Sequence, residues 1–244
     1  MGYIENIVWY LYERVYEVIL NKLLPRQLML ENVLEILKVS AKGKYLDAGC
    51  GLGDFSFRIK ERGGEVIGID RSRYFLEKAK KKYSNINFMY GDLEKELYFL
   101  NNEEFDGVVS INTLYLIKNY KYISGYKVPL PLLEFRRVLK NKGVVVVVTP
   151  RCPGYSQIAI FKEHLKLSFQ RLGKFITIFQ LFFYFPYILI VVLANFYVVI
   201  KGKKGDYKFY RDEELKRFLE LCGFKNIRIN SCYANQNILA VAEK

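Results

Sequence analysis

The stretch that decides the fold is Leu46 to Asp54, which reads LDAGCGLGD. It continues a short apolar run that predicts a strand over residues 44–48, and it opens a helical pattern that extends to Arg62. The three glycines of the stretch permit positive φ angles and let a ligand approach the backbone closely. A strand, a glycine-rich bend and a helix in this order indicate a ligand site at the head of a sheet.

The spacing of the glycines argues against a dinucleotide as that ligand. The dinucleotide fingerprint places its third glycine one position later, where this chain has Asp54, and sets a pyrophosphate at the N-terminus of the helix. An acid at that position would repel phosphate. A cofactor without phosphate and with a positive charge therefore suits the bend better.

The rest of the chain alternates between strand and helix patterns, which predicts a βαβ series and a mostly parallel sheet. The five consecutive valines from Val144 to Val148 predict a central strand buried on both faces. Further strands are expected at 65–69, 86–89, 105–110, 225–231 and 237–242, and helices at 72–82, 130–139 and 212–222. The fold class expected from this pattern is α/β.

Two amphipathic helices are expected before the sheet, with a break near Pro25, because apolar residues recur at helical spacing from Tyr3 to Lys38. Residues 1–40 would then form an N-terminal helical cap. The first 20 residues contain three glutamates and lack a basic start and a small-residue cleavage site. We therefore expect no signal peptide.

One apolar segment departs from the alternating pattern. Residues 175–200 contain no charged side chain, and basic residues flank them on both sides. A single membrane crossing would separate strands that belong to one sheet. In addition, Pro186 divides the run into pieces of 11 and 14 residues, and at about 1.5 Å per residue the longer piece reaches only about 21 Å. We expect an apolar helical hairpin over 151–205 that covers a substrate site, rests on a membrane surface or forms a dimer contact.

Composition narrows the class of protein further. The 244 residues are 51% hydrophobic, so the chain can bury a sizeable core, and the net charge is +13. Such a surface attracts nucleic acid, anionic lipid or an acidic substrate, or it is simply a lysine-rich solvated face. Four cysteines without a C-x-x-C pattern and a single histidine are too few ligands for a structural Cys/His metal site. We expect no metal and a reducing cytoplasm.

Several ordered motifs resemble those of class I S-adenosylmethionine-dependent methyltransferases, closest in style to the small-molecule, quinone and lipid methyltransferases. The motifs are DAGCGLG at 47–53, VIGID at 66–70, MYGD at 89–92, FDGVVS at 105–110 and FRRVLKNKG at 135–143. The resemblance covers about 41–150 and 206–244, which would form the methyltransferase domain. It implies a Rossmann-like sheet of seven strands, mostly parallel, with the last strand antiparallel.

The resemblance also implies which residues bind S-adenosylmethionine. The glycines would form the bend against which the methionine and ribose parts lie, with Asp47 near the ammonium and sulfonium end. Asp70 would accept the ribose hydroxyls, and Asp92 would accept from the adenine amine, although each aspartate could also be a turn residue. The full set of expected cofactor-binding residues is Asp47, Gly49, Gly51, Gly53, Asp70, Arg71, Asp92, Leu93, Ser110 and Asn112.

Methyl transfer from a sulfonium is an in-line displacement that depends mainly on alignment and on exclusion of water, so a general base is optional. The candidates for a catalytic role are Tyr115, on the substrate side of the fourth strand, and His164, in the insertion. His164 can equally be a surface or packing residue. Cys152 lies between two prolines, but its surroundings do not match those of a cytosine-methylating nucleophile.

The apolar insertion favours a hydrophobic small-molecule or lipid-like acceptor, with the protein cytoplasmic or peripheral at a membrane surface. RNA is an alternative acceptor because of the positive charge, although the basic residues are scattered. The fourth-strand motif lacks the Asn/Asp-Pro-Pro-Tyr pattern of enzymes that methylate base amines. A non-catalytic binding scaffold and a homodimer formed through the insertion also remain open. The acceptor atom is not identified by the sequence.

Overall fold

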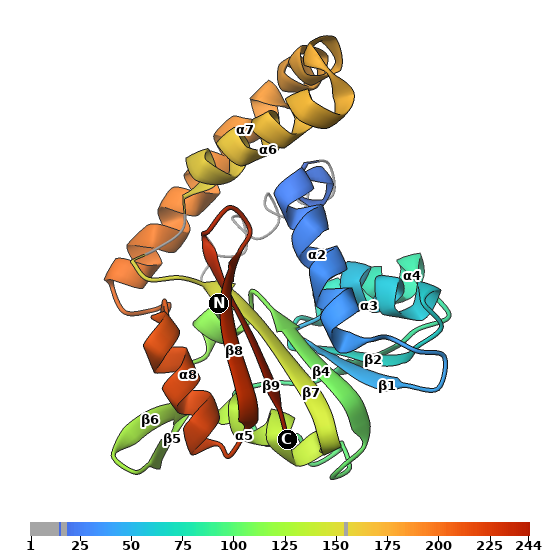
Figure 1. The fold of residues 1–244 in the computed structure, drawn as a ribbon, viewed down its shortest axis with the longest axis vertical. Coiled ribbons are helices and arrows are strands. Elements are labelled where there is room, and N and C mark those ends of the chain that lie inside the picture. The colour runs from blue at the N-terminus through green and yellow to red at the C-terminus, as the bar shows by residue number, and fades with distance from the viewer. Residues whose placement is uncertain (1–14, 16–18, 154–155) are drawn as a thin grey trace.

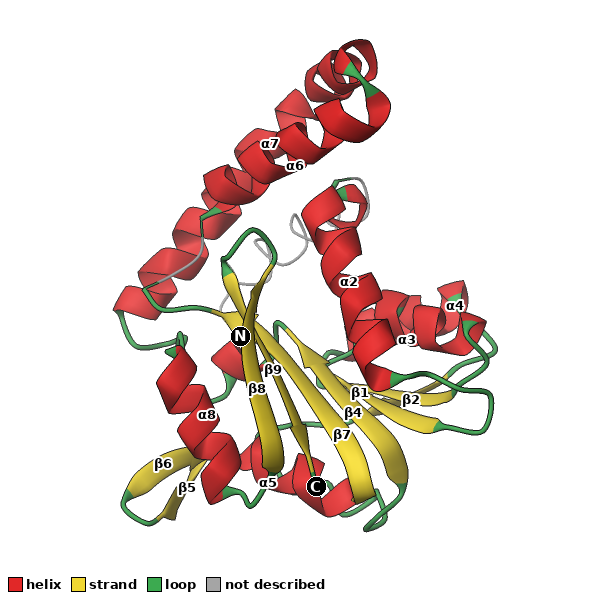
Figure 2. Cartoon of the chain, viewed as in Figure 1, coloured by secondary structure: helices red, strands yellow, loops and turns green. Residues whose placement is uncertain are grey.

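The computed structural model describes residues 15, 19–153 and 156–244. Within these residues the fold is built on a seven-stranded sheet with the order β3-β2-β1-β4-β7-β9-β8 (Figures 1 and 2). Its strands, in chain order, are β1 (Lys44–Ala48), β2 (Glu65–Asp70), β3 (Asn87–Tyr90), β4 (Phe105–Ile111), β7 (Leu139–Pro150), β8 (Lys225–Cys232) and β9 (Asn237–Glu243).

The strand pairing confirms the expected α/β class and the expected topology. β1 pairs in parallel with β2 and β4, β2 with β3, and β4 with β7, whereas β9 runs antiparallel to both β7 and β8. The carboxyl ends of β1, β2, β3, β4 and β7 therefore meet at one border of the sheet, called here the carboxyl edge. In open α/β sheets this is the border that binds ligands.

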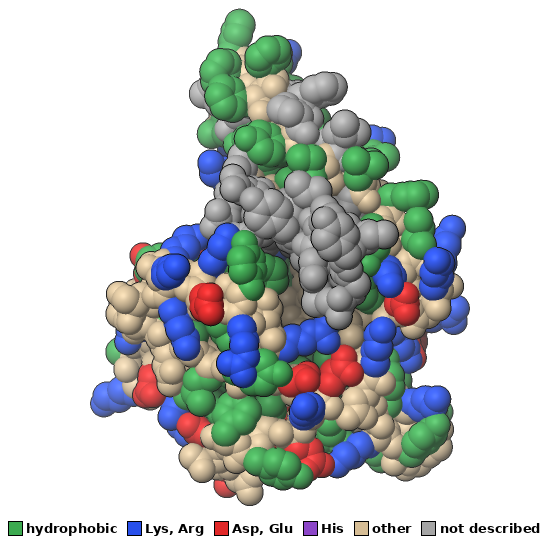
Figure 3. Space-filling view, turned by 180° about the vertical axis from the view of Figure 1, so that it is seen from behind, with side chains coloured by type: hydrophobic (Ala, Val, Ile, Leu, Met, Phe, Trp, Pro, Cys, Tyr) green, Lys and Arg blue, Asp and Glu red, His purple; other side chains and the backbone are tan. Residues whose placement is uncertain are grey.

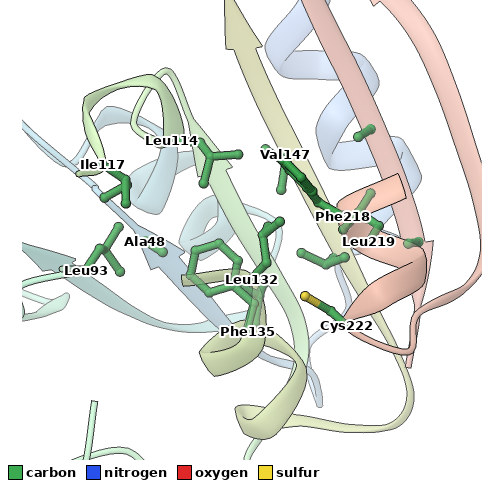
Figure 4. Packing of buried hydrophobic residues seen from close by; sticks show 14 of the residues in the cluster. Ala48, Leu93, Leu114, Ile117, Leu132, Phe135, Val147, Phe218, Leu219 and Cys222 are labelled. Carbon is green, nitrogen blue, oxygen red and sulfur yellow. The ribbon is translucent and has the colours of Figure 1, made fainter. Parts of the chain in front are cut away.

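Helices cover both faces of the sheet. On one face lie α2 (Leu24–Leu37), α3 (Asp54–Glu61) and α4 (Arg73–Lys82), and on the other lie α5 (Leu130–Val138) and α8 (Asp212–Leu221). Figure 4 shows part of the second layer, where Phe135 of α5 and Phe218 of α8 pack with Val147 of the sheet. Each face thus has its own apolar core.

The valine run confirms the expected central strand. Val145 and Val147 belong to the core under α5 and α8, whereas Val146 and Val148 belong to the core under α2 and α3, and all four are fully buried. Because successive strand residues point to opposite faces, only a strand covered on both sides can bury consecutive valines.

A two-stranded hairpin between β4 and α5 is absent from the expectations above. It consists of β5 (Tyr120–Ile123) and β6 (Tyr126–Pro129), paired antiparallel and joined by Ser124 and Gly125. Both turn residues have positive φ angles, 48° and 82°. This is the backbone that a two-residue hairpin turn requires.

The expected N-terminal cap is described only in part. Its second helix is present as α2, preceded by the short helix η1 (Leu20–Lys22). Helix α2 packs against α3, β7 and α6 (Gln157–Leu172). The first expected helix lies outside the described residues apart from Val15 and Ile19. Both of these side chains are buried in the same core as α2.

The insertion after β7 is a pair of helices, α6 (Gln157–Leu172) and α7 (Lys174–Lys203), that projects beyond the sheet (Figure 1). The expected division at Pro186 is wrong, because α7 continues through that position as one helix of 30 residues. A proline removes one backbone donor and bends a helix, but here it does not end the helix. Among the described residues, no helix combines the length and the apolar character that a membrane crossing requires.

The two ends of this hairpin are fastened together at its base. The backbone N–H of Cys152 donates to the carbonyl oxygen of Tyr210 at 2.8 Å, and the guanidinium of Arg151 pairs with Asp212 at 2.8 Å. Near its far end, the hydroxyl groups of Ser168 in α6 and Thr177 in α7 lie 2.9 Å apart, both buried. The hairpin is therefore a defined structural unit.

Arg137 makes several of the contacts that hold the loop between β3 and β4. Arg137 of α5 pairs with the nearly buried carboxylate of Glu134 at 2.8 Å and donates to the carbonyl oxygens of Leu97 and Leu100. The same carboxylate also accepts the backbone N–H of Leu97, at 2.8 Å. Arg137 thus orders the second half of the loop whose first half contains the candidate site residue Asp92.

We predict that Arg137→Leu lowers the free energy of unfolding by about 2–3 kcal/mol, since it leaves a poorly solvated carboxylate and two carbonyl groups without their donor. Urea denaturation measures the effect. Arg136→Leu is the matched control: Arg136 makes one exposed hydrogen bond to Gly223, so its loss should change stability by less than about 1 kcal/mol. Equal effects of the two substitutions would contradict the assigned role.

Candidate functional site

The glycine bend at residues 49–53 joins β1 to α3 at the carboxyl edge. The N–H groups of Gly49 and Cys50 both donate to the carbonyl oxygen of Ile69 in β2, at 2.8 and 2.9 Å. The φ angles of Gly49, Gly51 and Gly53 are 87°, 54° and 79°. L-residues with a side chain rarely adopt these values, so the backbone of the bend depends on glycine at all three positions.

The surroundings of the three glycines differ. A Cβ at Gly49 would collide with Thr113, which follows β4, and a Cβ at Gly53 would collide with the ring of Phe88 in β3. A Cβ at Gly51 would meet no atom within 4 Å. Gly49 and Gly53 therefore serve close packing, whereas Gly51 presents bare backbone to open space, where a ligand can lie against it.

Asp70 ties this bend to the end of β2. One of its carboxylate oxygens accepts the N–H of Gly51 at 2.9 Å, and the other accepts the N–H of Ser72 at 2.8 Å. Burial raises the pKa of Asp70, and the two backbone hydrogen bonds oppose that rise. A carboxylate has about four acceptor positions, so Asp70 keeps capacity for two ligand hydroxyl groups beside the bend.

Asp47 is the most deeply buried acid of the site. Its side chain is only 2% exposed, and its Oδ2 accepts the hydroxyl of Ser56 in α3 at 2.6 Å. Burial raises the pKa of Asp47 to about 7, the Ser56 hydrogen bond opposes the rise, and the neighbouring charges of Asp70 and Asp54 add to it. Each charged neighbour that acts on Asp47 is itself an acid, which favours a cationic ligand nearby.

Asp54 does not face the bend as a free negative charge, which is what the sequence suggested. Its Oδ1 accepts from Lys82 at 2.9 Å and from the hydroxyl of Tyr83 at 2.6 Å, both at the end of α4. The carboxylate is thus turned toward α4 and balanced by a cation. Repulsion of phosphate by Asp54 is therefore not what makes the bend unsuitable for a dinucleotide, and the acids that remain beside the bend are Asp47 and Asp70, with Arg71 acting on Asp70.

The residues after β3 lie in a turn. Asp92 is partly buried, and its Oδ1 accepts the N–H of Glu94 at 3.1 Å, which is the turn contact weighed as an alternative for this residue. Leu93 is buried in the core under α5. Arg71, after β2, pairs with Glu94 at 3.3 Å on the surface and so connects the two loops. Contacts of these residues with a cofactor remain predictions.

Ser110 and Asn112 lie at the end of β4. The Ser110 hydroxyl is buried and donates to the carbonyl oxygen of Ala48 in β1 at 3.0 Å. Asn112 has a φ of 53°, and its Oδ1 accepts from the buried amide of Asn237 in β9 at 2.6 Å. Ser110 joins β4 to its neighbour β1, whereas Asn112 reaches past β7 to β9, and the cofactor contacts of both residues remain predictions.

Tyr115 lies in the short helix η2 (Leu114–Leu116) after β4, in an aromatic cluster with residues that follow the hairpin. Its ring meets Tyr207 edge to face at 5.5 Å between centroids and stacks on Phe209 at 6.2 Å. The aromatic cluster of Tyr115, Tyr207 and Phe209 connects the chain after β4 to the base of the hairpin. A substrate role for Tyr115 remains a prediction.

His164 connects the hairpin to α2. It is 6% exposed, and its Nδ1 accepts the N–H of Leu24, the first residue of α2, at 3.2 Å. Burial lowers the pKa of His164, so the ring is neutral at pH 7 and carries its proton on Nε2. This geometry gives His164 a capping function between two helices and offers nothing that marks it as a general base.

The described part of the chain offers neither a reactive cysteine in the bend nor a metal site. All four cysteines are free thiols. Cys50, within the bend, is buried, and burial raises the pKa of its thiol well above the usual range, so it is no nucleophile. Among the described residues, no cluster of His, Cys, Asp or Glu side chains is arranged to bind a metal ion.

Sequence reasoning missed two residues that shape the site. Ser56 hydrogen-bonds to Asp47, and it lies one helical turn into α3, where the sequence gives no sign of its direction. Thr113 packs against Gly49. That contact pairs the end of β4 with the bend after β1, and only the parallel register of these strands reveals it.

A hollow at the opposite border of the sheet is separate from this site. It is lined by residues at the starts of β1 and β4 and by the turn within β7, among them Lys38, Lys42, Asp106 and Lys140. Asp106 is already bonded to Lys140 and to the N–H of Lys44, at 2.8 Å each. The acids and the glycine bend described above are at the carboxyl edge.

Comparison with known proteins agrees with this geometry. The methyltransferase domain family matches residues 40–200. The chain belongs to that family. The match confirms the expected class I S-adenosylmethionine-dependent methyltransferase, and with it an enzyme.

Demethylmenaquinone methyltransferases are among its curated relatives. The protein from Staphylococcus carnosus is 29% identical over 215 residues, which covers 82% of this chain and 76% of the relative. The one from Staphylococcus saprophyticus is 28% identical over 215 residues, with 82% and 78% covered.

Solved structures share the fold. A methyltransferase from Aquifex aeolicus that depends on S-adenosylmethionine has a TM-score of 0.55 at 15% identity, with 88% of each chain covered. A second, from Archaeoglobus fulgidus, has a TM-score of 0.57 at 18% identity, with 90% of this chain and 94% of the other covered.

The residues present fit S-adenosylmethionine. The backbone at Gly51 faces open space, the Asp70 carboxylate beside it can accept hydroxyl groups, and Asp47 and Asp70 form an acidic environment, in which the charge of Asp70 acts on Asp47 and that of Arg71 acts on Asp70. A ligand with a ribose and two positive charges matches this combination. Asp70 and the bend would hold the ribose and methionine parts, with Asp47 near the positive end.

We predict that Asp47→Asn stabilises the protein above pH 7. Because the pKa of Asp47 is raised to about 7, the folded protein keeps a proton that the unfolded chain loses above about pH 4, so stability falls as the pH rises from about 4 to about 7. Asparagine keeps the Ser56 hydrogen bond without the charge. The gain at pH 8 should be at most about 4 kcal/mol, since one pKa unit is about 1.4 kcal/mol.

Urea denaturation of both proteins at pH 4 and pH 8 measures this difference, which should vanish near pH 4. Ser56→Ala is the companion variant, because it removes the hydrogen bond that stabilises the ionised form and should lower stability at pH 8. A loss of stability by Asp47→Asn at both pH values would refute the interpretation.

We predict that Asp70→Asn weakens S-adenosylmethionine binding about 10- to 100-fold, because an amide cannot accept from Gly51, Ser72 and the ribose as a carboxylate does. Isothermal titration measures the affinity. Asp106→Asn, at the opposite border of the sheet, is the matched control and should bind as the wild type does. Unchanged affinity in Asp70→Asn would remove this residue from the site.

Proposed function

We propose that this methyltransferase methylates an apolar aromatic acceptor of the quinol type, such as the reduced form of demethylmenaquinone. The observation that carries the proposal is the similarity, at 28–29% identity over 82% of the chain, to proteins named demethylmenaquinone methyltransferases. The structure supports it with an apolar helical hairpin and an aromatic cluster beside the carboxyl edge.

The cofactor and the protein make different contributions to methyl transfer. When bound, S-adenosylmethionine supplies a methyl group on a sulfonium that is already activated for displacement. The protein has to align an acceptor with that methyl group and to exclude water, and proximity alone can contribute roughly 7–11 kcal/mol. The rigid bend, fixed by two hydrogen bonds to Ile69 and one to Asp70, provides a defined position for one partner.

The acceptor would lie beside the chain that returns from the hairpin, where Tyr115 and Tyr207 are buried and Phe209 is partly exposed. Tyr207 and Phe209 follow α7 and pack against Tyr115, and the N–H of Lys208 between them donates to the Tyr115 carbonyl oxygen at 2.9 Å. Aromatic rings of this kind suit a flat apolar ring and keep water away from it. Because a sulfonium methyl group is electrophilic, the acceptor ring has to be electron-rich, which favours the reduced quinol over the quinone.

A methyl-transfer assay tests the proposal. With radiolabelled S-adenosylmethionine, we expect label in a short-tailed demethylmenaquinol kept reduced under anaerobic conditions, and about background label in the oxidised quinone. Transfer RNA, offered in a parallel reaction at low salt, should stay unlabelled. Label in RNA and none in the quinol would replace the proposal with the RNA alternative. Asp70→Asn at limiting S-adenosylmethionine should lower the quinol signal and serves to show that the label comes from this site.

A further inference from the structure

The outer side of α7 bears exposed apolar side chains within residues 175–183 and again within 192–196, called here the α7 stripe. Phe175 and Phe182 are 92% and 83% exposed, values expected of a residue with almost no neighbours. The described members of the stripe, all more than half exposed, are Phe175, Ile178, Phe179, Phe182, Leu193 and Phe196. Single exposed apolar residues are ordinary, but a row of this size marks a surface that another phase or molecule covers.

The spacing places these residues on one face of the helix. At 3.6 residues per turn, all six fall within about one third of the helix circumference. Thr177 and Val191, on the opposite side of α7, are 1% and 3% exposed. Thr177 contacts α6, and Val191 belongs to the core that includes α2. The fold therefore uses one side of α7 for packing and leaves the other side outward along its length.

Basic side chains predominate around the stripe, and two of them pair with acids just outside it: Lys166 with Glu163 at 3.8 Å and Lys201 with Asp206 at 3.0 Å. From residue 164 to residue 205 the chain contains no acid and six bases, Lys166, Arg171, Lys174, Lys201, Lys203 and Lys204. Lys174 begins α7, and Lys203 ends it. At about 1.5 Å per residue the helix is about 45 Å long, so bases stand at both ends of the apolar row. Figure 3 shows green apolar side chains along the projecting part and no red acidic side chain on it in that view.

We propose that the α7 stripe lies flat on the surface of an anionic lipid bilayer. An apolar helical face bounded by bases is the pattern of helices that rest in the membrane interface, where aromatic rings enter the acyl boundary and cations meet anionic headgroups. The stripe extends parallel to the helix axis, so the whole length of α7 contacts the surface at once. The proposal rests on the proposed function for its purpose, since a quinol with a long apolar tail is dissolved in lipid.

A second copy of the chain is a poorer partner for the stripe. Two α7 helices packed face to face would bring like charges together at both ends in either orientation, because bases stand at each end and the segment from 164 to 205 has no acid. An anionic bilayer instead balances these charges. The excess of bases over acids at the two ends is therefore what favours lipid over self-association.

The hairpin would deliver an acceptor from the bilayer to the site. It begins directly after β7, whose carboxyl end lies on the carboxyl edge, and it ends at the segment that carries Tyr207 and Phe209. The links between Cys152 and Tyr210 and between Arg151 and Asp212 hold the base of the hairpin to that edge. Contact of the stripe with lipid thus fixes the position of the methyl-donor site relative to the bilayer.

Vesicle flotation tests the proposal with the whole protein. At about 0.05 M salt we expect flotation with phosphatidylcholine vesicles that contain about 30% phosphatidylglycerol, much less with phosphatidylcholine alone, and a drop of about tenfold at about 0.5 M salt. The double variant Phe179→Ser/Phe182→Ser should bind the anionic vesicles about tenfold more weakly. Lys203→Gln/Lys204→Gln should weaken binding to anionic vesicles and leave binding to neutral vesicles unchanged.

The matched control is Tyr98→Ser/Tyr122→Ser, which removes two aromatic side chains that are 84% and 72% exposed on the body of the protein. It should float as the wild type does. Thermal melting and S-adenosylmethionine titration of each variant verify that the fold and the donor site are intact. No flotation of the wild type at low salt, or equal flotation of the phenylalanine variant, would overturn the proposal. Dimerisation that the phenylalanine variant abolishes, without vesicle binding, would assign the stripe to a second copy.

The same proteins separate this proposal from the proposed function. Methyl transfer to the short-tailed quinol in detergent-free solution needs no vesicle. Transfer without flotation would refute only the lipid contact, whereas flotation without transfer would refute only the quinol acceptor.

Discussion

The hydrogen bonds from the N–H groups of Gly51 and Ser72 to the Asp70 carboxylate are the contact on which the site depends. They join the bend after β1 to the turn after β2, and the parallel pairing of these strands brings the two loops to one edge of the sheet. The same carboxylate is the group that we propose for ribose binding. In that proposal, one side chain both ties the two loops together and binds the ligand.

Much of the fold could be predicted because its signals are local. The valine run, the glycine bend and the alternation of strand and helix patterns each report on a few neighbouring residues, and the strands found are within a few residues of those expected, although β7 begins earlier, at Leu139. Two errors have clear causes. Pro186 was given the weight of a helix terminator, whereas α7 continues through it. The β5–β6 hairpin was overlooked although Ser124 and Gly125 carry its turn signal.

The site was less predictable, because its chemistry depends on contacts between residues distant in sequence. Asp54 was judged by its position after the glycines, but Lys82, 28 residues later, accounts for its charge. His164 suggested a base until its bond to Leu24, 140 residues away, placed it between two helices. The raised pKa of Asp47 follows from burial that no sequence pattern reports. Family resemblance located the site, and the fold was needed to distinguish its structural residues from those that can face a ligand.

The fastened base of the α6–α7 hairpin has an evolutionary consequence. Because Cys152 and Tyr210 are directly hydrogen-bonded, the chain enters and leaves this excursion at nearly the same point. Material between the two residues can lengthen, shorten or be exchanged without altering the register of β7 against β9. The arrangement separates the sheet, which carries the proposed donor site, from the exposed α6–α7 hairpin. Selection can then change the second while the first is conserved.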